Sequence, residues 1–345
     1  MKKFRTAMAL LFAVVLLSAV GCKKDDPVTN FDTMLGTINL PFPRFVTAGY
    51  EAKFGLDSLT TLTLKDGTTK GLGYYVKDNC NNKTDTLVRS DGSVIKKEFA
   101  IKVPDVLGNF KVELVAFAEG YYTSSAISEY SIVREGLNGD ASLTNFEFYE
   151  SDFIYPDPRD LTPYICTTVG DTDWMRQNLC WAGAGRPIED SEAAGNIFGR
   201  FYTHSEALDA CPEDWTLPTE QDWVDLAAAL GKSGAASETF SDIAGDLRDR
   251  VNFNGTEMWE YWPGINPSNT SMLSMLPVGY AQFSEGVYRY FDFGKYAMFW
   301  SAEEADGMAS ARYMYQDQPC LYYGEFPAEE TALPVRCVRK AVTSH

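Results

Sequence analysis

The chain has 345 residues, of which 45% are hydrophobic and 14% aromatic. Its length favours two domains, and its apolar content is enough for packed cores, which excludes global disorder. The formal net charge of −18 at pH 7 repels the phosphates of nucleic acid. We therefore expect a folded protein with no nucleic-acid partner.

A basic start and a short apolar run open the chain. Lys2, Lys3 and Arg5 precede the uncharged stretch 7–20, which is too short to span a bilayer comfortably and is typical of a signal peptide. Small residues stand before Cys22, and this pattern resembles the lipobox of bacterial lipoproteins. The resemblance implies cleavage before Cys22, acylation of that cysteine, and attachment to the membrane through the lipid. The acidic residues Asp25 and Asp26, just after Cys22, resemble a surface-export signal, so we expect display on the outer membrane. An ordinary secretory signal with a chance cysteine is the alternative.

Cysteine and histidine usage limits the chemistry that the chain can carry. An oxidising compartment favours disulfides among the six cysteines after Cys22, but six cysteines allow fifteen pairings and sequence alone does not choose. No two of them form a C-x-x-C pair, and the only histidines are His204 and His345. Zinc sites and Cys-His catalysis are therefore poorly supported, and we expect neither a metal nor a cofactor.

Short β-branched and aromatic segments follow one another between residues 35 and 135. Turn signals separate them, because glycine tolerates the positive φ of tight hairpins. In 110–118 apolar and polar residues alternate, which implies one buried face. The predicted strands are 52–54, 62–64, 72–76, 99–103, 110–118 and 126–133. Their spacing favours a β-sandwich, and the architecture resembles the Ig-like or PKD-like modules of exported bacterial lipoproteins.

The second half carries all seven tryptophans and the clearest helix. Thr219, followed by early acidic residues, is typical of a helix start. Trp223 and Leu226 then recur at helical spacing, and Gly231 is suited to the end of the helix. We predict a helix here and an earlier one over 203–210.

Ordered short blocks in this half resemble a known family. The blocks are 157–160, 174–179, 199–203, 210–212, 215–219, 276–280, 299–302 and 335–339. Together they resemble the Fibrobacter succinogenes major paralogous domain, a family of exported bacterial proteins. The resemblance implies a C-type-lectin-like α+β fold and a disulfide between Cys211 and Cys337.

The other cysteines leave alternatives open. Cys166 and Cys180 flank a predicted turn and are candidates for a second bridge, and Cys180–Cys320 is the rival pairing. Cys80 stands alone in the first half, where we expect a free buried thiol.

Few residues support catalysis. A glycosidase needs two carboxylates that face each other across a cleft, which adjacent acids such as Glu303 and Glu304 do not provide. A Ser-His-Asp triad would need His204, which we expect to be structural. Lectin-like relatives that oxidise cysteine need a reactive pair late in the domain, whereas Cys337 is expected in a bridge and Cys320 lacks a neighbouring cation. We predict no enzymatic activity and no catalytic residue.

Two aromatic stretches are candidates for sugar binding, because an aromatic ring packs well on the apolar face of a pyranose. The candidate ligand-binding residues are Trp259, Trp262, Tyr288 and Tyr290. The alternative, that these rings fill a loop-rich core, stays open. The calcium motifs of C-type lectins are missing, so no calcium site is predicted.

The predicted organisation has five parts. They are a lipoprotein signal peptide (1–21), a tether (22–34), an Ig-like β-sandwich (35–135), a linker (136–156) and the family's C-type-lectin-like domain (157–340). The fold class is thus a mainly β N-terminal sandwich plus an α+β C-terminal domain. The predicted function is that of a non-catalytic, lipid-anchored envelope protein that binds an extracellular glycan or protein. The alternative is a structural or assembly component of the bacterial envelope.

Overall fold

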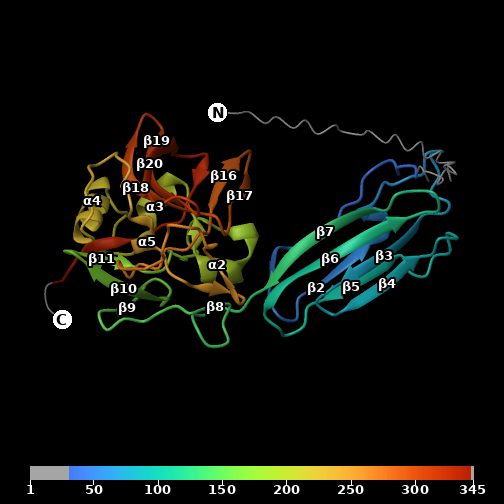
Figure 1. Cartoon of the computed structure of the whole chain (residues 1–345), viewed down its shortest axis with the longest axis horizontal. Helices are drawn as coiled ribbons and strands as arrows, with labels where there is room; N and C mark the ends of the chain where they lie inside the picture. The colour runs from blue at the N-terminus through green and yellow to red at the C-terminus, as the bar shows by residue number, and fades with distance from the viewer. Residues whose placement is uncertain (1–30, 343–345) are drawn as a thin grey trace, which may run out of the picture.

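The computed structural model describes residues 31–342, which form two parts (Figure 1). The N-terminal part consists of long strands, and the C-terminal part combines strands with short helices. The protein is thus mainly β, with several sheets. The predicted signal peptide, Cys22 and most of the tether lie outside the described residues. Within 31–342, no helix is both long and apolar enough to cross a bilayer.

Strands and a short helix make up the N-terminal part. They are β1 (Phe45–Val46), β2 (Glu51–Gly55), α1 (Leu56–Leu59), β3 (Gly73–Asp78), β4 (Lys83–Val88), β5 (Glu98–Lys102), β6 (Gly108–Phe117) and β7 (Ser124–Ile132). A five-stranded sheet has the order β1-β7-β6-β3-β4, in which only the β1-β7 pair is parallel. The antiparallel pair β2-β5 forms a second sheet.

The core of the N-terminal part lies between these two sheets. Val112 and Leu114 of β6 pack in the same apolar cluster as Phe99 and Ile101 of β5. The alternation predicted for 110–118 is therefore confirmed, since β6 buries the expected face. The assignment of this part to an Ig-like or PKD-like sandwich stays a prediction.

Two details of the N-terminal part differ from the sequence prediction. The segment 62–64 is not a strand, because its pairing is limited to an isolated bridge between Thr63 and Leu35. Conversely, β4 pairs with β3 although no strand was predicted there. As an edge strand, β4 exposes most of its polar residues, so its sequence lacks the apolar alternation that marks a half-buried strand.

The C-terminal part has more and shorter elements. Its strands are β8 (Leu143–Thr144), β9 (Phe153–Pro156), β10 (Pro163–Val169), β11 (Thr172–Met175), β12 (Arg186–Pro187), β13 (Arg200–Phe201), β14 (Asn252–Phe253), β15 (Thr256–Glu257), β16 (Tyr280–Ser284), β17 (Val287–Phe291), β18 (Tyr296–Ala305), β19 (Met308–Tyr315), β20 (Tyr322–Pro327), β21 (Thr331–Ala332) and β22 (Val338–Lys340). Its helices are the 3₁₀ turn η1 (Ile188–Asp190), α2 (Glu192–Phe198), α3 (His204–Ala210), α4 (Glu220–Ala229) and α5 (Ala244–Leu247). The sheets have the orders β22-β11-β10-β9, β18-β19-β20, β17-β16-β21, β15-β14-β8 and β12-β13.

The β18-β19-β20 sheet separates two apolar cores. Successive residues of a strand point to opposite faces, so Met298 and Trp300 enter one core while Ala297 and Phe299 enter the other. Helix α3 contributes to the first core and α4 to the second, where Trp223 packs. The sheet is therefore buried on both faces along much of its length.

The capping residues that the sequence indicates do start the two predicted helices. Thr219 and Asp222 form a reciprocal capping box at α4, and Thr203 and Glu206 do the same at α3. Gly231 follows α4 with φ +71°, a left-handed conformation that glycine adopts without strain. Both helices are confirmed within one or two residues at their ends.

The last strands form a closing segment, residues 331–340, that touches most of the C-terminal part. Leu333 bridges to Tyr202, and Val338 bridges to Thr216 while pairing with Trp174 of β11. In Figure 1 this red end of the chain lies beside the green strand β11. The segment thus joins the beginning of the C-terminal part to its end.

Arg336 fixes the middle of the closing segment by hydrogen bonds instead of an ion pair. Its buried guanidinium donates to the carbonyl oxygens of Met175 (3.1 Å) and Leu273 (2.9 Å) and to the side chain of Asn178 (2.6 Å). Burial, and then the nearby Arg176 cation, lower the pKa of Arg336 to about 9. Because backbone carbonyl oxygens accept most of its hydrogen bonds, the Arg336 guanidinium holds the surrounding backbone segments in position.

The two parts meet through an aromatic contact. Phe45 of β1 lies in the apolar core of the C-terminal part, with ring centroids 5.9 Å from Phe198, 6.2 Å from Phe253 and 5.5 Å from Phe293. The amide of Asn254 adds hydrogen bonds to backbone carbonyls of β6 and β7. These contacts hold the two parts in a defined relation.

Residues 136–156, which the sequence indicates as a linker, carry secondary structure in the C-terminal part. Strand β8 pairs with β14, and β9 pairs with β10. Leu143 and Phe146 are buried in the same core as Phe45. The connection between the two parts is therefore packed along much of its length.

We expect Phe45→Ala to lower the free energy of unfolding by about 3–5 kcal/mol, because it removes a buried ring from the contact between the parts. Chemical denaturation measures the change, and limited proteolysis should cut near the contact faster than in the unaltered protein. Phe148→Ala is the matched control, because the Phe148 ring is 60% exposed. Equal losses in the two variants would contradict this account of the contact.

Candidate functional site

Trp259, a predicted ligand-binding ring, belongs to the core. It is 2% exposed, its Nε1 donates to the carbonyl oxygen of Met275 at 2.8 Å, and the Arg248 guanidinium lies 4.1 Å from its ring centroid. The prediction that Trp259 stacks on a sugar is therefore wrong. Its indole N–H finds a backbone acceptor inside the fold, which allows the whole ring to be buried.

The other three predicted rings do not form one site with each other. Trp262 is 42% exposed, but the hollow beside it measures about 20 Å³, which is room for about one water molecule. Tyr290 is half-buried, and its hydroxyl donates to the carbonyl oxygen of Pro187 at 2.7 Å. Tyr288 stacks beside Tyr290 with ring centroids 6.3 Å apart, and burial raises the pKa of Tyr288 to about 12. These contacts mainly stabilise β17.

A different group of rings surrounds a hollow of about 240 Å³. We call it the tyrosine hollow, and its lining residues are Tyr280, Gln282, Asp292, Tyr296, Met298, Tyr315, Phe326 and Thr331. They come from β16, the turn after β17, and β18 to β21. Figure 1 shows β16 and β17 beside the β18-β19-β20 sheet, and a bridge between Gly279 and Ala297 joins the two.

The rings of the tyrosine hollow meet at steep angles. Tyr296 and Tyr315 are register partners on β18 and β19, with centroids 4.7 Å apart and planes at 71°. Tyr280 lies 5.7 Å from Tyr296 at 59°. Tyr315 is 39% exposed, so its ring is accessible from solvent. The rings thus form walls around the hollow instead of one closed stack.

Strand alternation places these rings on one face of the sheet. Tyr313 and Tyr322 pair across β19 and β20 and stack at 5.4 Å next to the hollow. Gly324 lies under this cluster, because a Cβ atom there would come within 3.0 Å of the Tyr313 ring and 2.9 Å of the Phe326 ring. A side chain at 324 would therefore displace the rings.

Polar groups in the tyrosine hollow are available for a ligand. Within the described residues, the side chains of Gln282, Asp292 and Thr331 make no hydrogen bond. Burial, and then the nearby Asp292 carboxylate, raise the pKa of Tyr280, which keeps its phenol protonated at neutral pH. Several rings together with unpaired polar groups are what a saccharide site requires.

Two larger hollows differ from the tyrosine hollow in their lining. One of about 500 Å³ in the N-terminal part is lined mostly by threonine and aliphatic residues, with Tyr74 as its single ring. Another of about 440 Å³ lies where the two parts meet and is also lined by rings, but its Asn79, Asn109 and Ser131 side chains already make hydrogen bonds within the protein. Its rings are Phe110, Tyr130, Phe253 and Phe293, and Arg44, Lys111 and Glu129 are its charged residues. The tyrosine hollow is therefore the better candidate for a ligand site.

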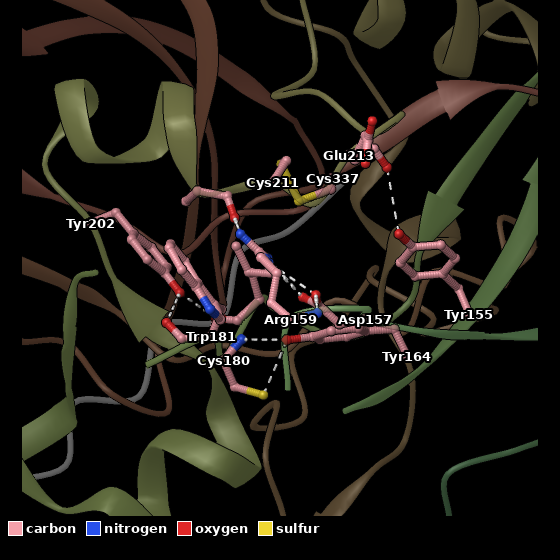
Figure 2. Close-up of a disulfide and its surroundings, with 12 residues drawn as sticks. Tyr155, Asp157, Arg159, Tyr164, Cys180, Trp181, Tyr202, Cys211, Glu213 and Cys337 are labelled. Carbon is pink, nitrogen blue, oxygen red and sulfur yellow. Dashed lines mark hydrogen bonds and ion pairs between the residues drawn. A yellow bond between two sulfur atoms is a disulfide. The ribbon is translucent and has the colours of Figure 1, made fainter. Parts of the chain in front are cut away.

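A disulfide joins Cys211, at the end of α3, to Cys337 in the closing segment. This is the pair that the family resemblance implies. The sequence separation is 126 residues, so in the chain-entropy model the bridge stabilises the fold by about 5 kcal/mol before strain. Figure 2 shows it beside the cluster around Arg159.

Arg159 connects the start of the C-terminal part to α3. Figure 2 shows it between Trp181 and Asp157, with its guanidinium 3.9 Å from a Trp181 ring centroid and 2.7 Å from an Asp157 oxygen. It also donates to the carbonyl oxygen of Ala210 at 2.8 Å. The 157–160 block is therefore structural, because its charged groups bind each other and the helix end.

The second predicted bridge is not formed. Cys166, Cys180 and Cys320 are free thiols. The Tyr164 hydroxyl lies 3.3 Å from the Cys180 sulfur, which it contacts in place of another cysteine (Figure 2). Cys180 packs in the first core while Leu321, next to Cys320, packs in the second, so the rival pairing is not formed either. Burial raises the pKa of Cys166 to about 12.

Cys80 is also free, and it is half-buried. Burial raises the pKa of its thiol. The thiol is therefore mostly protonated at neutral pH and a poor nucleophile.

The acids and the histidine weighed for catalysis have structural partners. The buried Glu220 forms an ion pair with the buried Arg312, and the Glu303 carboxylate accepts the Glu220 backbone N–H at 2.8 Å. His204 is buried, with Nε2 at 2.9 Å from the carbonyl oxygen of Ser301. Among residues 31–342, no group of three or more His, Cys, Asp or Glu side chains is arranged to hold a metal ion.

The rings of the tyrosine hollow are residues that the sequence prediction missed. The sequence pattern that marks these rings is a tyrosine at every second position, as in Tyr313-Met314-Tyr315. Further tyrosines, Tyr296 and Tyr322, lie on the neighbouring strands. Such alternation indicates one shared face within a strand, but it does not show which strands pair.

Comparison with known proteins supports the family resemblance. The family model of the Fibrobacter succinogenes major domain matches residues 167–339, half of the chain. The chain belongs to this family. The match takes in the disulfide and every lining residue of the tyrosine hollow, so the hollow is a feature of the Fibrobacter succinogenes major domain of this chain. No curated protein and no solved structure matches the chain.

We expect Trp259→Ala to lower the free energy of unfolding by about 3–5 kcal/mol, because it leaves a cavity in the core of the Fibrobacter succinogenes major domain. Trp262→Ala, only three positions away, should change it by less than about 1 kcal/mol because Trp262 is 42% exposed and lies outside the core. Denaturant titration of both variants measures the difference. A larger loss in Trp262→Ala would show that the assignment of core and surface is reversed.

Proposed function

We propose that this chain is an exported, lipid-anchored protein of the cell envelope that binds an extracellular glycan without altering it chemically. The tyrosine hollow carries the proposal. It is lined by the rings of Tyr280, Tyr296 and Tyr315, of which Tyr315 is 39% exposed and Tyr296 8%, beside the unpaired Gln282 and Asp292 side chains. A pyranose has apolar faces and a rim of hydroxyls, so rings and hydrogen-bonding groups complement it.

The N-terminal features support an envelope location. The basic start, the apolar stretch 7–20 and Cys22 follow the order of a lipoprotein signal, and the outer-membrane surface is the proposed site of display. Several acyl chains hold a protein stably, at about 0.8 kcal/mol per buried CH₂. We further propose that the N-terminal part is an Ig-like sandwich that serves as a spacer, and that the C-terminal part has a C-type-lectin-like layout.

The contact around Phe45 gives this spacer a mechanical role. Because the ring is buried in the core of the C-terminal part, the spacer sets the orientation of the tyrosine hollow as well as its distance from the membrane. Orientation matters for a receptor that meets a ligand outside the cell.

Assembly of the envelope is a second candidate function. Val94, Ile95 and Ile127 of the N-terminal part are about half exposed, and Val94 and Ile95 follow the edge strand β4. Val94 bridges to Val88 and the Ile95 N–H donates to the carbonyl oxygen of Leu87, so both residues lie against the end of β4 with their side chains exposed. Exposed aliphatic residues of this kind favour contact with another protein. Such a protein would be captured from an envelope extract by the N-terminal part, independently of the tyrosine hollow.

We expect Tyr315→Ala to weaken glycan binding about tenfold, or about 1.4 kcal/mol, because it removes an accessible wall of the hollow. A glycan array screened with the full mature chain selects the ligand, and isothermal titration measures its affinity. Tyr261→Ala is the matched control, since Tyr261 is 75% exposed and lies outside the hollow. Failure of the unaltered protein to bind any glycan would exclude this function.

We expect intact-mass spectrometry of the protein from its native membrane to show cleavage before Cys22 and acyl chains on that residue. Cys22→Ser should remove both features and leave the precursor uncut. Cys80→Ser, which keeps Cys22, serves as control and should be processed normally. A mature protein without acyl chains would show that residues 1–21 are an ordinary secretory signal and that Cys22 carries no lipid anchor.

A further inference from the structure

The lining of the tyrosine hollow carries negative charge and no positive charge. Asp292 is the single ionisable carboxylate among the lining residues, and none of them is Lys, Arg or His. The chain as a whole carries a net charge of −18. A ligand with a carboxylate or sulfate would therefore enter a negative field with no cation to receive it.

Asp292 is held in place by a tight turn after β17. Its φ is +56°, a left-handed conformation, and its backbone carbonyl accepts the N–H of Lys295 at 3.0 Å. The N–H of Gly294 donates to the carbonyl oxygen of Pro277 at 2.7 Å, which joins the turn to the segment just before β16. The backbone at Asp292 is thus fixed, and its exposed carboxylate, which makes no hydrogen bond within the described residues, is available to a ligand.

Gly279 allows the turn after β17 to lie close to the start of β16. A Cβ atom at 279 would lie 1.9 Å from the carbonyl oxygen of Phe291, so only glycine fits against the chain there. Its φ of +79° is also left-handed. The position of Asp292 beside Tyr280 therefore depends on backbone packing, which a ligand does not need to create.

The rings favour positive charge at the same place. The face of an aromatic ring is electronegative, and it attracts an ammonium group within about 6 Å of its centroid. Tyr280, Tyr296 and Tyr315 present rings at angles of 59° and 71° to one another around the hollow. The lining of the hollow combines these rings, of which Tyr315 is the most exposed, with the Asp292 carboxylate, so a cation inside it meets both kinds of group.

We propose that the tyrosine hollow selects a sugar that bears a protonated amino group, as in non-acetylated glucosamine, and rejects uronic acids. The sugar ring packs on the tyrosines and the ammonium group pairs with Asp292, while Gln282 and Thr331 serve the hydroxyls. This inference rests on the proposed glycan-binding function and names the class of sugar.

The test compares three short oligosaccharides by isothermal titration with the full mature chain. They are a glucosamine trimer, an N-acetylglucosamine trimer and a galacturonic acid trimer, at a pH where the free amine is protonated. We expect about tenfold tighter binding of the glucosamine trimer than of its neutral acetylated form, and no measurable binding of the acid. The preference should shrink as salt rises, because a partly exposed ion pair is screened.

Asp292→Asn is the decisive variant. It keeps the size of the side chain and removes the charge, so the preference for the amine should fall to about twofold or less, with little change for the acetylated trimer. Asp306→Asn, in the exposed turn between β18 and β19 and outside the hollow, is the matched control and should keep the full preference. Melting temperatures of both variants check that the fold is unchanged.

The outcomes separate this inference from the proposed function. Equal binding of the amine and acetylated trimers, or a preference that survives Asp292→Asn, would overturn the selection of an amino sugar while leaving glycan binding in place. Tight binding of the uronic acid trimer would also overturn it. Absence of binding to all three trimers and to every sugar on an array would overturn the glycan function itself.

Discussion

The C-terminal part depends on where its closing segment lies. Residues 331–340 pair with β11, bridge to Tyr202 and Thr216, and are bonded covalently to the end of α3 through Cys337. The cysteine partner is 126 residues away in the chain, so none of these contacts is local. Arg336 adds hydrogen bonds to the carbonyl oxygens of Met175 in β11 and of Leu273 in a further segment. Strand β11 and the last strand, β22, are thereby held together.

The tyrosine hollow depends on the burial of one sheet. In its middle the β18-β19-β20 sheet is buried on both faces, as the complete burial of Phe299 in one core and of Trp300 in the other indicates. Toward Tyr315 and Tyr322 the rings of the same face become partly exposed, and β16 lies beside them instead of a helix. The hollow lies where the aromatic face of the β18-β19-β20 sheet extends beyond the residues that pack over it. A site of this kind is rigid, because its walls belong to strands that the cores hold in register.

The junction between the two parts has a similar physical basis. Phe45 fills a position among Phe198, Phe253 and Phe293, so a residue of the first part completes the core of the second. Residues 136–156 contribute β8 and β9 to the C-terminal part. A packed junction fixes the orientation of the C-terminal part relative to the spacer, whereas a flexible linker would limit only the distance between them. Ligand capture outside a membrane benefits from that difference.

Local signals in the sequence determined the helix starts at Thr203 and Thr219, the buried face of β6 and, through ordered motifs, the family and its disulfide pair. These features depend on neighbouring residues or on a recognisable order of blocks. Tertiary structure alone decided which aromatic rings are buried. Trp259 is buried because the carbonyl oxygen of Met275 accepts its N–H and the Arg248 guanidinium covers its face, and neither residue is its neighbour in the sequence. Tyr280, Tyr296 and Tyr315 meet at one hollow because β18 and β19 pair in a register that neither strand specifies alone, and because the bridge between Gly279 and Ala297 brings the separate β16 sheet beside them.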